Sequence, residues 1–140
     1  MSEATYTTLF EVPSIETYRH LRSASGLSPK TLEAAARGLP ATLFAVQVLH
    51  QGITVGMGRV VGDGGCFYQV TDIAVLPAHQ GKGLGKLVMR HIMDYLKAHA
   101  LPSAYVSLIA DGPAKALYAQ FGFVPTAPAS IGMAWQPGAG

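Results

Sequence analysis

A short glycine-rich run, residues 80–86, is the part of this sequence best suited to hold a charged ligand. It reads Gln-Gly-Lys-Gly-Leu-Gly-Lys and follows a β-branched, apolar stretch that ends at Val75. Glycines allow a tight turn, and successive N–H groups at a helix N-terminus point at one anion with the aid of the helix dipole. The run therefore predicts a phosphate-binding loop.

Two common nucleotide-binding loops do not fit this run. The nucleoside-triphosphate loop needs Ser or Thr after Gly-Lys, but Leu87 follows Gly85-Lys86, and the residue five before Gly85 is Gln80. The dinucleotide fingerprint needs a third glycine where this sequence has Lys86 or Val88. Both are excluded, and a tight helix start with no ligand is the alternative to a different phosphate loop.

The loop needs a helix after it, and the sequence predicts one. Leu84, Val88 and Ile92 recur at helical spacing on one face, while Lys86 falls largely on the other. We expect this helix to begin within the loop and to end near Ala100.

Six stretches rich in β-branched and aromatic residues are predicted as strands. They are residues 6–11, 43–49, 53–61, 67–75, 104–109 and 131–135. Two helices are expected between the first two strands, one starting at Ser14 and one capped by Ser28-Pro29 and ending at Gly38. Asp111-Gly112-Pro113 opens another helix that reaches about Phe121.

The element order β-α-α-β-β-β-α-β-α-β predicts the α/β class with a mixed, mostly antiparallel sheet. Glycine-containing turns at residues 50–52 and 62–65 give an antiparallel meander. The long helix makes the strands on either side of it parallel neighbours through a right-handed crossover. We expect a single domain over residues 1–140, because no linker or internal repeat interrupts the chain.

Composition restricts the possible partners and the compartment. The formal net charge is only +2 and no dense Lys/Arg run occurs, so nucleic acid is not expected as a partner. Cys66 is the single cysteine, which excludes an internal disulfide, and no Cys/His/carboxylate spacing predicts a metal. The sequence shows no signal peptide or apolar span, so we expect a cytoplasmic protein that does not engage a membrane.

Two motifs in this chain resemble those of the GCN5-related N-acetyltransferase (GNAT) superfamily. Gln80-x-x-Gly83-x-Gly85 resembles its pyrophosphate loop, Arg/Gln-x-x-Gly-x-Gly/Ala, and residues 71–77 resemble its fourth strand. Residues 111–123, with Ala114, Leu117-Tyr118 and Phe121-Gly122-Phe123, resemble its Asn-x-x-Ala-x-x-Leu-Tyr-x-x-x-Gly-Phe segment. The resemblance covers residues 66–124, and two motifs in order are more specific than either alone.

The resemblance implies an N-acetyltransferase that moves the acetyl group of acetyl-CoA to a primary amine by direct attack in a ternary complex. It also implies a sheet whose middle strands are bulged and splayed, so that the coenzyme arm pairs with their main chain. The implied coenzyme contacts are Ile73, Ala74, Val75, Gln80, Gly81, Lys82, Gly83, Leu84, Gly85, Lys86, Asp111 and Tyr118. A coenzyme-A-binding sensor without catalysis is the alternative function.

The catalytic candidates have structural alternatives. By resemblance, Tyr118 stands near the coenzyme sulfur and protonates the departing thiolate, but it also falls on the apolar face of its helix. Asp72 is the only carboxylate of the fourth strand, and acts as a general base through water or satisfies a turn or neighbouring strand. Asp111 replaces the family's asparagine and equally suits a helix cap. Lys82 and Lys86 neutralise phosphate or are solvated.

The acceptor amine is not specified by these motifs. Residues 14–38 and 125–131 lie outside them and are expected to select it, as a small molecule or a protein amine. Tyr18, Arg19 and Arg22 line an acceptor cleft, or else Tyr18 is core and the arginines are solvated surface. A homodimer is compatible with the family resemblance.

Overall fold

The computed structural model describes residues 5–138, and its contacts divide the chain into two units, Met1–Leu108 and Ile109–Gly140. The first contains a sheet of five strands, β1 (Tyr6–Leu9), β2 (Phe44–His50), β3 (Ile53–Gly62), β4 (Phe67–Val75) and β5 (Tyr105–Ser107). Its α-helices are α1 (Ile15–Ala24), α2 (Leu32–Gly38) and α3 (Leu84–His99).

The strands stand in the sheet in chain order, β1-β2-β3-β4-β5. The first four pair antiparallel with their neighbours, and β4 pairs with β5 in parallel. This confirms the predicted mixed sheet, in which the antiparallel meander is followed by a parallel strand after the α3 crossover. The short turns allow the meander, whereas the parallel pair needs the long helical connection.

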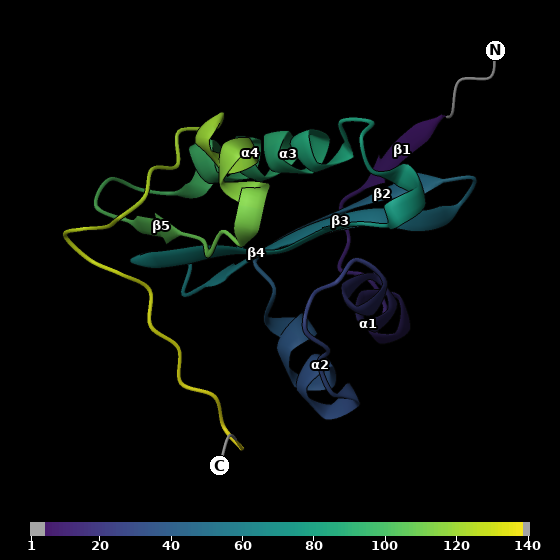
Figure 1. The fold of residues 1–140 in the computed structure, drawn as a ribbon, viewed down its shortest axis with the longest axis horizontal. Coiled ribbons are helices and arrows are strands. Elements are labelled where there is room, and N and C mark those ends of the chain that lie inside the picture. Colours follow the sequence, from purple (N-terminus) through teal and green to yellow (C-terminus); the bar gives the residue numbers. More distant parts are fainter. Residues whose placement is uncertain (1–4, 139–140) are drawn as a thin grey trace. The chain divides into compact units, whose positions relative to one another are not determined.

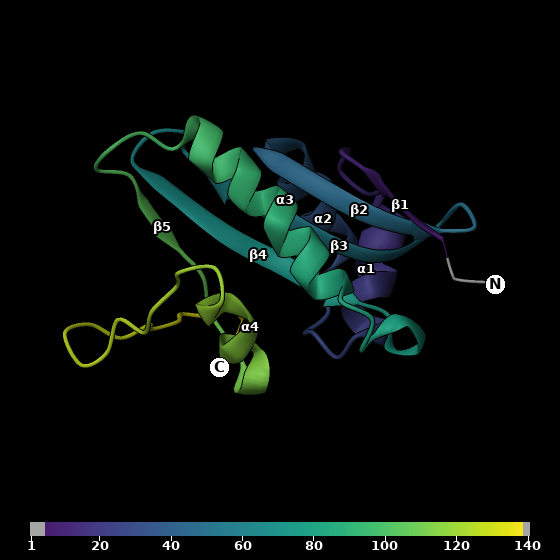
Figure 2. The same ribbon diagram turned by 90° about the horizontal axis from the view of Figure 1, so that it is seen from above.

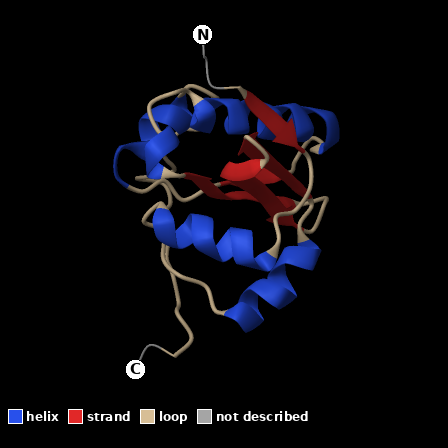
Figure 3. Cartoon of the chain, turned by 90° about the vertical axis from the view of Figure 1, so that its right-hand side faces the viewer, coloured by secondary structure: helices blue, strands red, loops and turns tan. Residues whose placement is uncertain are grey.

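Helices cover both faces of this sheet. Helix α3 lies across one face of β2, β3 and β4, and α1 with α2 lies on the opposite face (Figure 1, Figure 2). Figure 3 shows the strands between these two helical layers. The apolar face of α3 buries Leu84, Val88 and Ile92, as the helical spacing predicts.

Side-chain caps begin both helices that precede β2. Ser14 Oγ accepts a hydrogen bond from the Thr17 amide at 3.1 Å, as expected from the sequence. The second helix begins later than predicted, because Thr31 rather than Ser28-Pro29 caps it, with Thr31 Oγ1 accepting from the Ala34 amide at 3.0 Å. The helix ends at Gly38, as predicted.

The hairpin turn between β3 and β4 is held by one carboxylate. Asp63 Oδ1 accepts hydrogen bonds from the amides of Gly65, Cys66 and Phe67 at 2.8–3.0 Å. These amides, Phe67 foremost, hold the pKa of Asp63 below its usual range. The predicted turn at residues 62–65 is confirmed, and β4 starts at the predicted residue.

A bulge interrupts the pairing of β3 with β4. Met57 pairs with Ala74 and Arg59 pairs with Thr71. The partner strand therefore has two residues, 72 and 73, opposite the single Gly58. Asp72 takes a left-handed backbone conformation with φ of 60°.

This bulge changes the face to which β4 side chains point. Opposed residues in an antiparallel pair share a face, and a Cβ on Gly58 would contact Val88 and Ile92 of α3. Val70, opposite Val60, therefore lies on the α3 face, whereas Ala74 packs with Met57 on the α1 face. Even-numbered residues of β4 are buried along the whole strand, but against different helices.

The parallel pairing of β4 with β5 is short. It joins residues 67–69 to Tyr105–Ser107 and ends at Gln69 and Ser107. Beyond Gln69, β4 continues to Val75 with no paired strand on its β5 side among the described residues. The splay expected of the middle strands is present at this point.

The second unit contains a 3₁₀ turn, Gly112–Ala114, followed directly by α4, Lys115–Ala119. The predicted single helix reaching Phe121 is therefore shorter, and the backbone amides of Phe121 and Phe123 both bond to the carbonyl of Tyr118 in a turn. The predicted strand at 131–135 is wrong. These residues have no ladder partner among the described residues, and Ile131, Met133 and Trp135 are exposed.

Candidate coenzyme site

Two glycines shape the loop between β4 and α3. Gly81 has φ of 78°, and Gly83, the N-cap residue of α3, has φ of 81°. Both conformations are left-handed and disfavour side chains with a Cβ. A Cβ built on either glycine would meet no atom within 4 Å, so the loop faces open space.

The backbone amides of this loop have no acceptor of their own. The first α3 hydrogen bond outside the helix proper runs from the Leu87 amide to the Gly83 carbonyl at 3.0 Å. Within the described chain, no acceptor takes a hydrogen bond from the amides of Gly81, Lys82, Gly83, Leu84, Gly85 or Lys86. A helix start with consecutive free N–H groups and the positive end of the dipole is suited to a phosphate.

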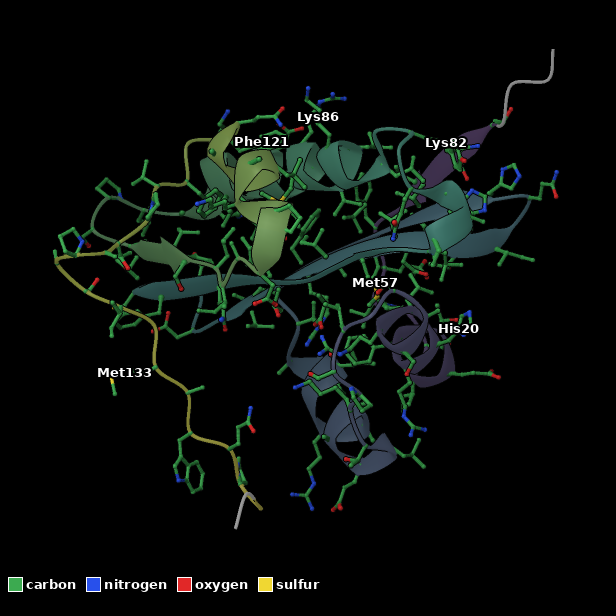
Figure 4. The ribbon with its side chains drawn as sticks, in the orientation of Figure 1. His20, Met57, Lys82, Lys86, Phe121 and Met133 are labelled. Atoms are coloured by element: carbon green, nitrogen blue, oxygen red, sulfur yellow. The ribbon has the colours of Figure 1, made fainter. Side chains whose placement is uncertain are left out.

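Side chains around the loop have different roles. Gln80 does not face a ligand with its amide nitrogen, because Nε2 donates to the Val75 carbonyl at 2.9 Å and so fastens the loop to the end of β4. Lys82 and Lys86 are exposed and extend on the α3 side of the sheet, whereas Met57 lies on the α1 side (Figure 4). Neither lysine forms a salt bridge with a described residue.

His79 anchors the entrance to the loop. Its Nδ1 is 2.8 Å from the Tyr6 hydroxyl of β1, and its ring lies 5.1 Å from that of His50. The histidine belongs to the short 3₁₀ helix Pro77–His79. It therefore ties the loop to the first two strands.

The last residues of β4 lead directly to this loop. Ala74 is buried against α1, while Ile73 and Val75 are half-buried. Their side chains belong to the core. The backbone of this stretch lies beyond the point where β5 pairing ends. Apart from the Val75 carbonyl, which accepts from Gln80, its main-chain groups on that side are open to an added extended chain.

Asp72 is held in a buried cluster of charges. Its Oδ1 accepts from Arg22 Nη1 at 2.5 Å and from the Tyr18 hydroxyl at 3.0 Å, and its Oδ2 accepts from Arg59 Nε at 2.9 Å. The Asp72 side chain is only 2% exposed. We call these four residues, Tyr18, Arg22, Arg59 and Asp72, the Asp72 cluster.

The cluster decides between the alternatives for α1. Tyr18 is core, and burial with the adjacent Asp72 carboxylate raises the pKa of its phenol, which stays a hydrogen-bond donor. Arg22 is buried rather than solvated, contrary to the surface alternative. The sequence analysis did not select Arg59. An arginine in one strand of a hairpin and an aspartate in the next strand nevertheless indicate a buried ion pair, such as that of Arg59 with Asp72.

Tyr118 and Asp111 lie in the second unit. Tyr118 is half-buried, and burial, followed by the charge of Asp111, raises the pKa of its phenol. Asp111 is exposed and is the N-cap residue of the 3₁₀ turn, where its carbonyl accepts from the Ala114 amide but its side chain makes no cap hydrogen bond. A protonated phenol is the state required of a proton donor.

Two further observations concern metals and membranes. Among residues 5–138, no three His, Cys, Asp or Glu side chains are grouped so as to hold a metal ion. In the same part of the chain, no helix combines the length and apolarity needed to cross a bilayer.

Comparison with known proteins assigns this chain to a family. The model of the acetyltransferase (GNAT) family matches residues 8–123. This chain belongs to the GNAT family. GNAT enzymes use acetyl-CoA as acyl donor and an amine as acceptor.

Solved structures of GNAT proteins have the same fold. A meticillin-resistant Staphylococcus aureus protein described as "Probable Acetyltransferase" is 49% identical, with a TM-score of 0.91 over 94% of this chain and 99% of that one. A GNAT family acetyltransferase from Streptococcus pneumoniae is 27% identical, with a TM-score of 0.78 over 94% and 98%.

Curated relatives match over a shorter stretch. The "Uncharacterized N-acetyltransferase ycf52" of Porphyra purpurea is 30% identical over 83 residues, which are 59% of this chain and 47% of that protein. That of Pyropia yezoensis is 29% identical over the same length. The chain spans about half the length of the curated relatives it matches.

Proposed function

We propose that this chain is an N-acetyltransferase that transfers the acetyl group of acetyl-CoA to a primary amine by direct attack in a ternary complex. The observation that carries this proposal is the run of amides from Gly81 to Lys86, which have no acceptor among the described residues. These amides, with the α3 dipole, bind the diphosphate of the donor. Lys82 and Lys86 add positive charge beside it.

The main chain of Ile73, Ala74 and Val75 holds the extended arm of the donor. Its open side lies where β4 has lost its β5 partner, so an extended ligand can pair there like an added strand. The arm then leads from the diphosphate loop to the point where the two strands part. The thioester is presented at this point.

The reaction forms a C–N bond and breaks a C–S bond. The acceptor nitrogen attacks the thioester carbonyl carbon and gives up a proton to water, and the sulfur leaves as a thiolate. Backbone N–H groups of Ala74 and Val75 stabilise the oxyanion. Tyr118 donates its phenolic proton to the thiolate and is reprotonated from solvent; Asp111 is proposed as a neighbouring coenzyme contact.

Asp72 was the candidate general base, and its surroundings do not favour that role. Both carboxylate oxygens already accept hydrogen bonds from the other members of the Asp72 cluster. With three donors on its two oxygens and a side chain only 2% exposed, the carboxylate is closed off from water and from an acceptor amine. We therefore assign proton removal from the acceptor to solvent.

The remaining proposals concern partners and place of action. The acceptor is a small-molecule or protein amine selected by residues 14–38 and 125–131. We further propose a cytoplasmic enzyme that acts without nucleic acid or a membrane, and a homodimer is compatible with this function.

Titration calorimetry with acetyl-CoA tests the binding step. In Gly83→Ala, the Cβ forces a strained backbone and occupies the open space before the amides. We expect acetyl-CoA affinity to fall about tenfold or more, the equivalent of one lost charge-assisted hydrogen bond. Gly64→Ala is the matched control, since Gly64 has φ of 79° and equally open surroundings in the β3–β4 turn.

Thiol release from acetyl-CoA with a panel of amines tests the transfer step. Release that depends on the amine supports the enzyme. Tight binding without release with any amine would instead favour the coenzyme-binding sensor. No binding by the wild-type protein would refute both.

A further inference from the structure

The Asp72 cluster lies beneath the bulge of β4 and makes none of the proposed coenzyme contacts. It buries two arginines, each with a side chain 9% exposed, against one carboxylate. Buried charges are costly unless they are paired and fully hydrogen-bonded. No buried side-chain nitrogen or oxygen among the described residues lacks a partner, so the cluster meets this requirement.

The cluster sits on the strained residue of the bulge. Asp72 has φ of 60°, a conformation that non-glycine residues adopt at a cost and keep only where their surroundings hold them. Three donors converge on its side chain from two elements, α1 and β3. The carboxylate is thus fixed on the α1 face, although the regular alternation of β4 would direct residue 72 to the α3 face.

The arginines extend the cluster beyond these elements. Arg22 Nε donates to the Ser28 carbonyl at 2.9 Å and Nη2 donates to Ser28 Oγ at 3.0 Å. Arg59 Nη1 donates to Thr42 Oγ1, just before β2. One carboxylate therefore joins β4 to α1, to the segment after α1 and to the start of β2.

We propose that Asp72 is a positioning residue, whose carboxylate stabilises the bulge conformation and fixes the position of α1 against β4. The bulge directs the main chain of residues 73–75, along which the donor arm lies, and α1 belongs to the proposed acceptor side. The cluster thereby sets the donor strand and the acceptor helices at a fixed spacing. This inference rests on the proposed acetyl-CoA function.

Asp72→Asn tests the proposal, because an amide keeps the shape but cannot accept from both arginines. We expect its acetyl-CoA dissociation constant, measured by calorimetry without an acceptor, to rise about tenfold, and kcat to fall with it. Val46→Ala is the control, because Val46 is fully buried in β2 and outside the cluster. It should lower the thermal midpoint without changing acetyl-CoA affinity.

Two results would overturn the positioning role. One is a folded Asp72→Asn protein with unchanged acetyl-CoA affinity and unchanged kcat. The other is unchanged affinity with a lower kcat and a shifted pH profile, which identifies a base. If Asp72→Asn does not fold, Arg22→Lys and Tyr18→Phe replace it, each weakening the cluster and each expected to reduce affinity about threefold. Wild-type protein that fails to bind acetyl-CoA refutes the proposed function instead.

Discussion

At the scale of single residues, Tyr118 is the proposed proton donor whose ionisation the structure describes. Burial and the charge of Asp111 raise the pKa of its phenol above the usual value. A raised pKa keeps the phenol protonated to higher pH than a free tyrosine, whose pKa is about 10. The donor form is therefore present throughout the neutral and mildly alkaline range.

Tyr118→Phe should lower kcat without abolishing turnover. A thiolate with a reference pKa of about 8.5 leaves readily, so we expect a loss of about ten- to a hundredfold. The ratio of wild-type to variant kcat should stay constant from pH 7 to about 9, since the phenol does not ionise there. Thiol release measures both quantities.

Tyr105→Phe is the matched control for this prediction, because Tyr105 is a half-exposed phenol in β5 with no proposed contact to the donor. It should have wild-type kcat. A Tyr118→Phe protein as fast as wild type would remove Tyr118 from the mechanism.

The Asp72 cluster shows what single-residue reasoning in sequence lacks. Asp72 was recognisable as the one acid of its strand, but its partners come from α1 and β3, and the arginine of β3 was not selected at all. Arg22 is a charged residue between Leu21 and Ser23 in an amphipathic helix and resembles a surface residue. Its burial depends on how α1 packs on the sheet, which local spacing does not encode.

At the scale of elements, the contact of β3 with α3 depends on the absence of a side chain at Gly58. A Cβ there would lie 2.5 Å from Val88 Cγ1 and 2.7 Å from Ile73 Cδ1. These distances are shorter than van der Waals contact, so α3 or the bulge must move to admit a methyl group. The same helix carries the proposed coenzyme loop at its start.

Gly58→Ala should destabilise the fold by about 1–3 kcal/mol through overpacking. It should also weaken acetyl-CoA binding, because a shift of α3 moves the amides of its first turn. Denaturant unfolding and calorimetry measure the two effects. Gly56→Ala is the control, since a Cβ there would meet its nearest atom at 3.5 Å.

A Gly58→Ala protein with wild-type stability would show that the core yields at this point without strain. Loss of stability with unchanged acetyl-CoA affinity would show that a change in the packing of α3 does not disturb acetyl-CoA binding by the loop.

Residue types along the chain predicted most strands, and the connections between them predicted the pairing, because short glycine-containing turns join antiparallel neighbours and a long helical connection joins parallel ones. β4 was predicted with its observed bounds from its β-branched and aromatic residues between glycine-containing turns. A strand was also predicted at 131–135, where the structure has none, because a strand also needs a neighbouring edge to satisfy its backbone. The bulge was implied only by the family resemblance. Apolar residues occur in β4 both before and after it, so the residue types do not reveal the extra residue.

At the scale of the whole molecule, the two faces of the sheet have different proposed roles, donor binding and acceptor binding. The α3 side presents the proposed diphosphate loop, and the α1 side contains the proposed acceptor helices. Both sides meet β4, which supplies main chain to the proposed donor site and Asp72 to the cluster. Element order and the two motifs were sufficient to predict this architecture, whereas the acceptor could not be predicted because no motif covers residues 14–38.

Acetyl-CoA should stabilise the folded protein as a whole. At a free concentration of about 100 times the dissociation constant, a ligand that binds only the folded state adds about 2.7 kcal/mol to the free energy of unfolding. This predicts a rise in the thermal midpoint of roughly 5–15 °C. Differential scanning fluorimetry with and without acetyl-CoA measures it, with Gly83→Ala showing a smaller rise and Gly64→Ala the full one.

The additional residue in the β4 bulge determines the face to which the Asp72 side chain points, so the Asp72 cluster depends on the length of this strand. Removing Ile73 alone would leave one residue opposite Gly58 and allow an uninterrupted ladder. Asp72 would then turn toward Val88 and Ile92, leaving Arg22 and Arg59 without their anion inside the protein. An in-frame deletion of one codon would thus restore a regular β3–β4 ladder and move the Asp72 carboxylate from the α1 face to the α3 face. No substitution at this site can reproduce that change.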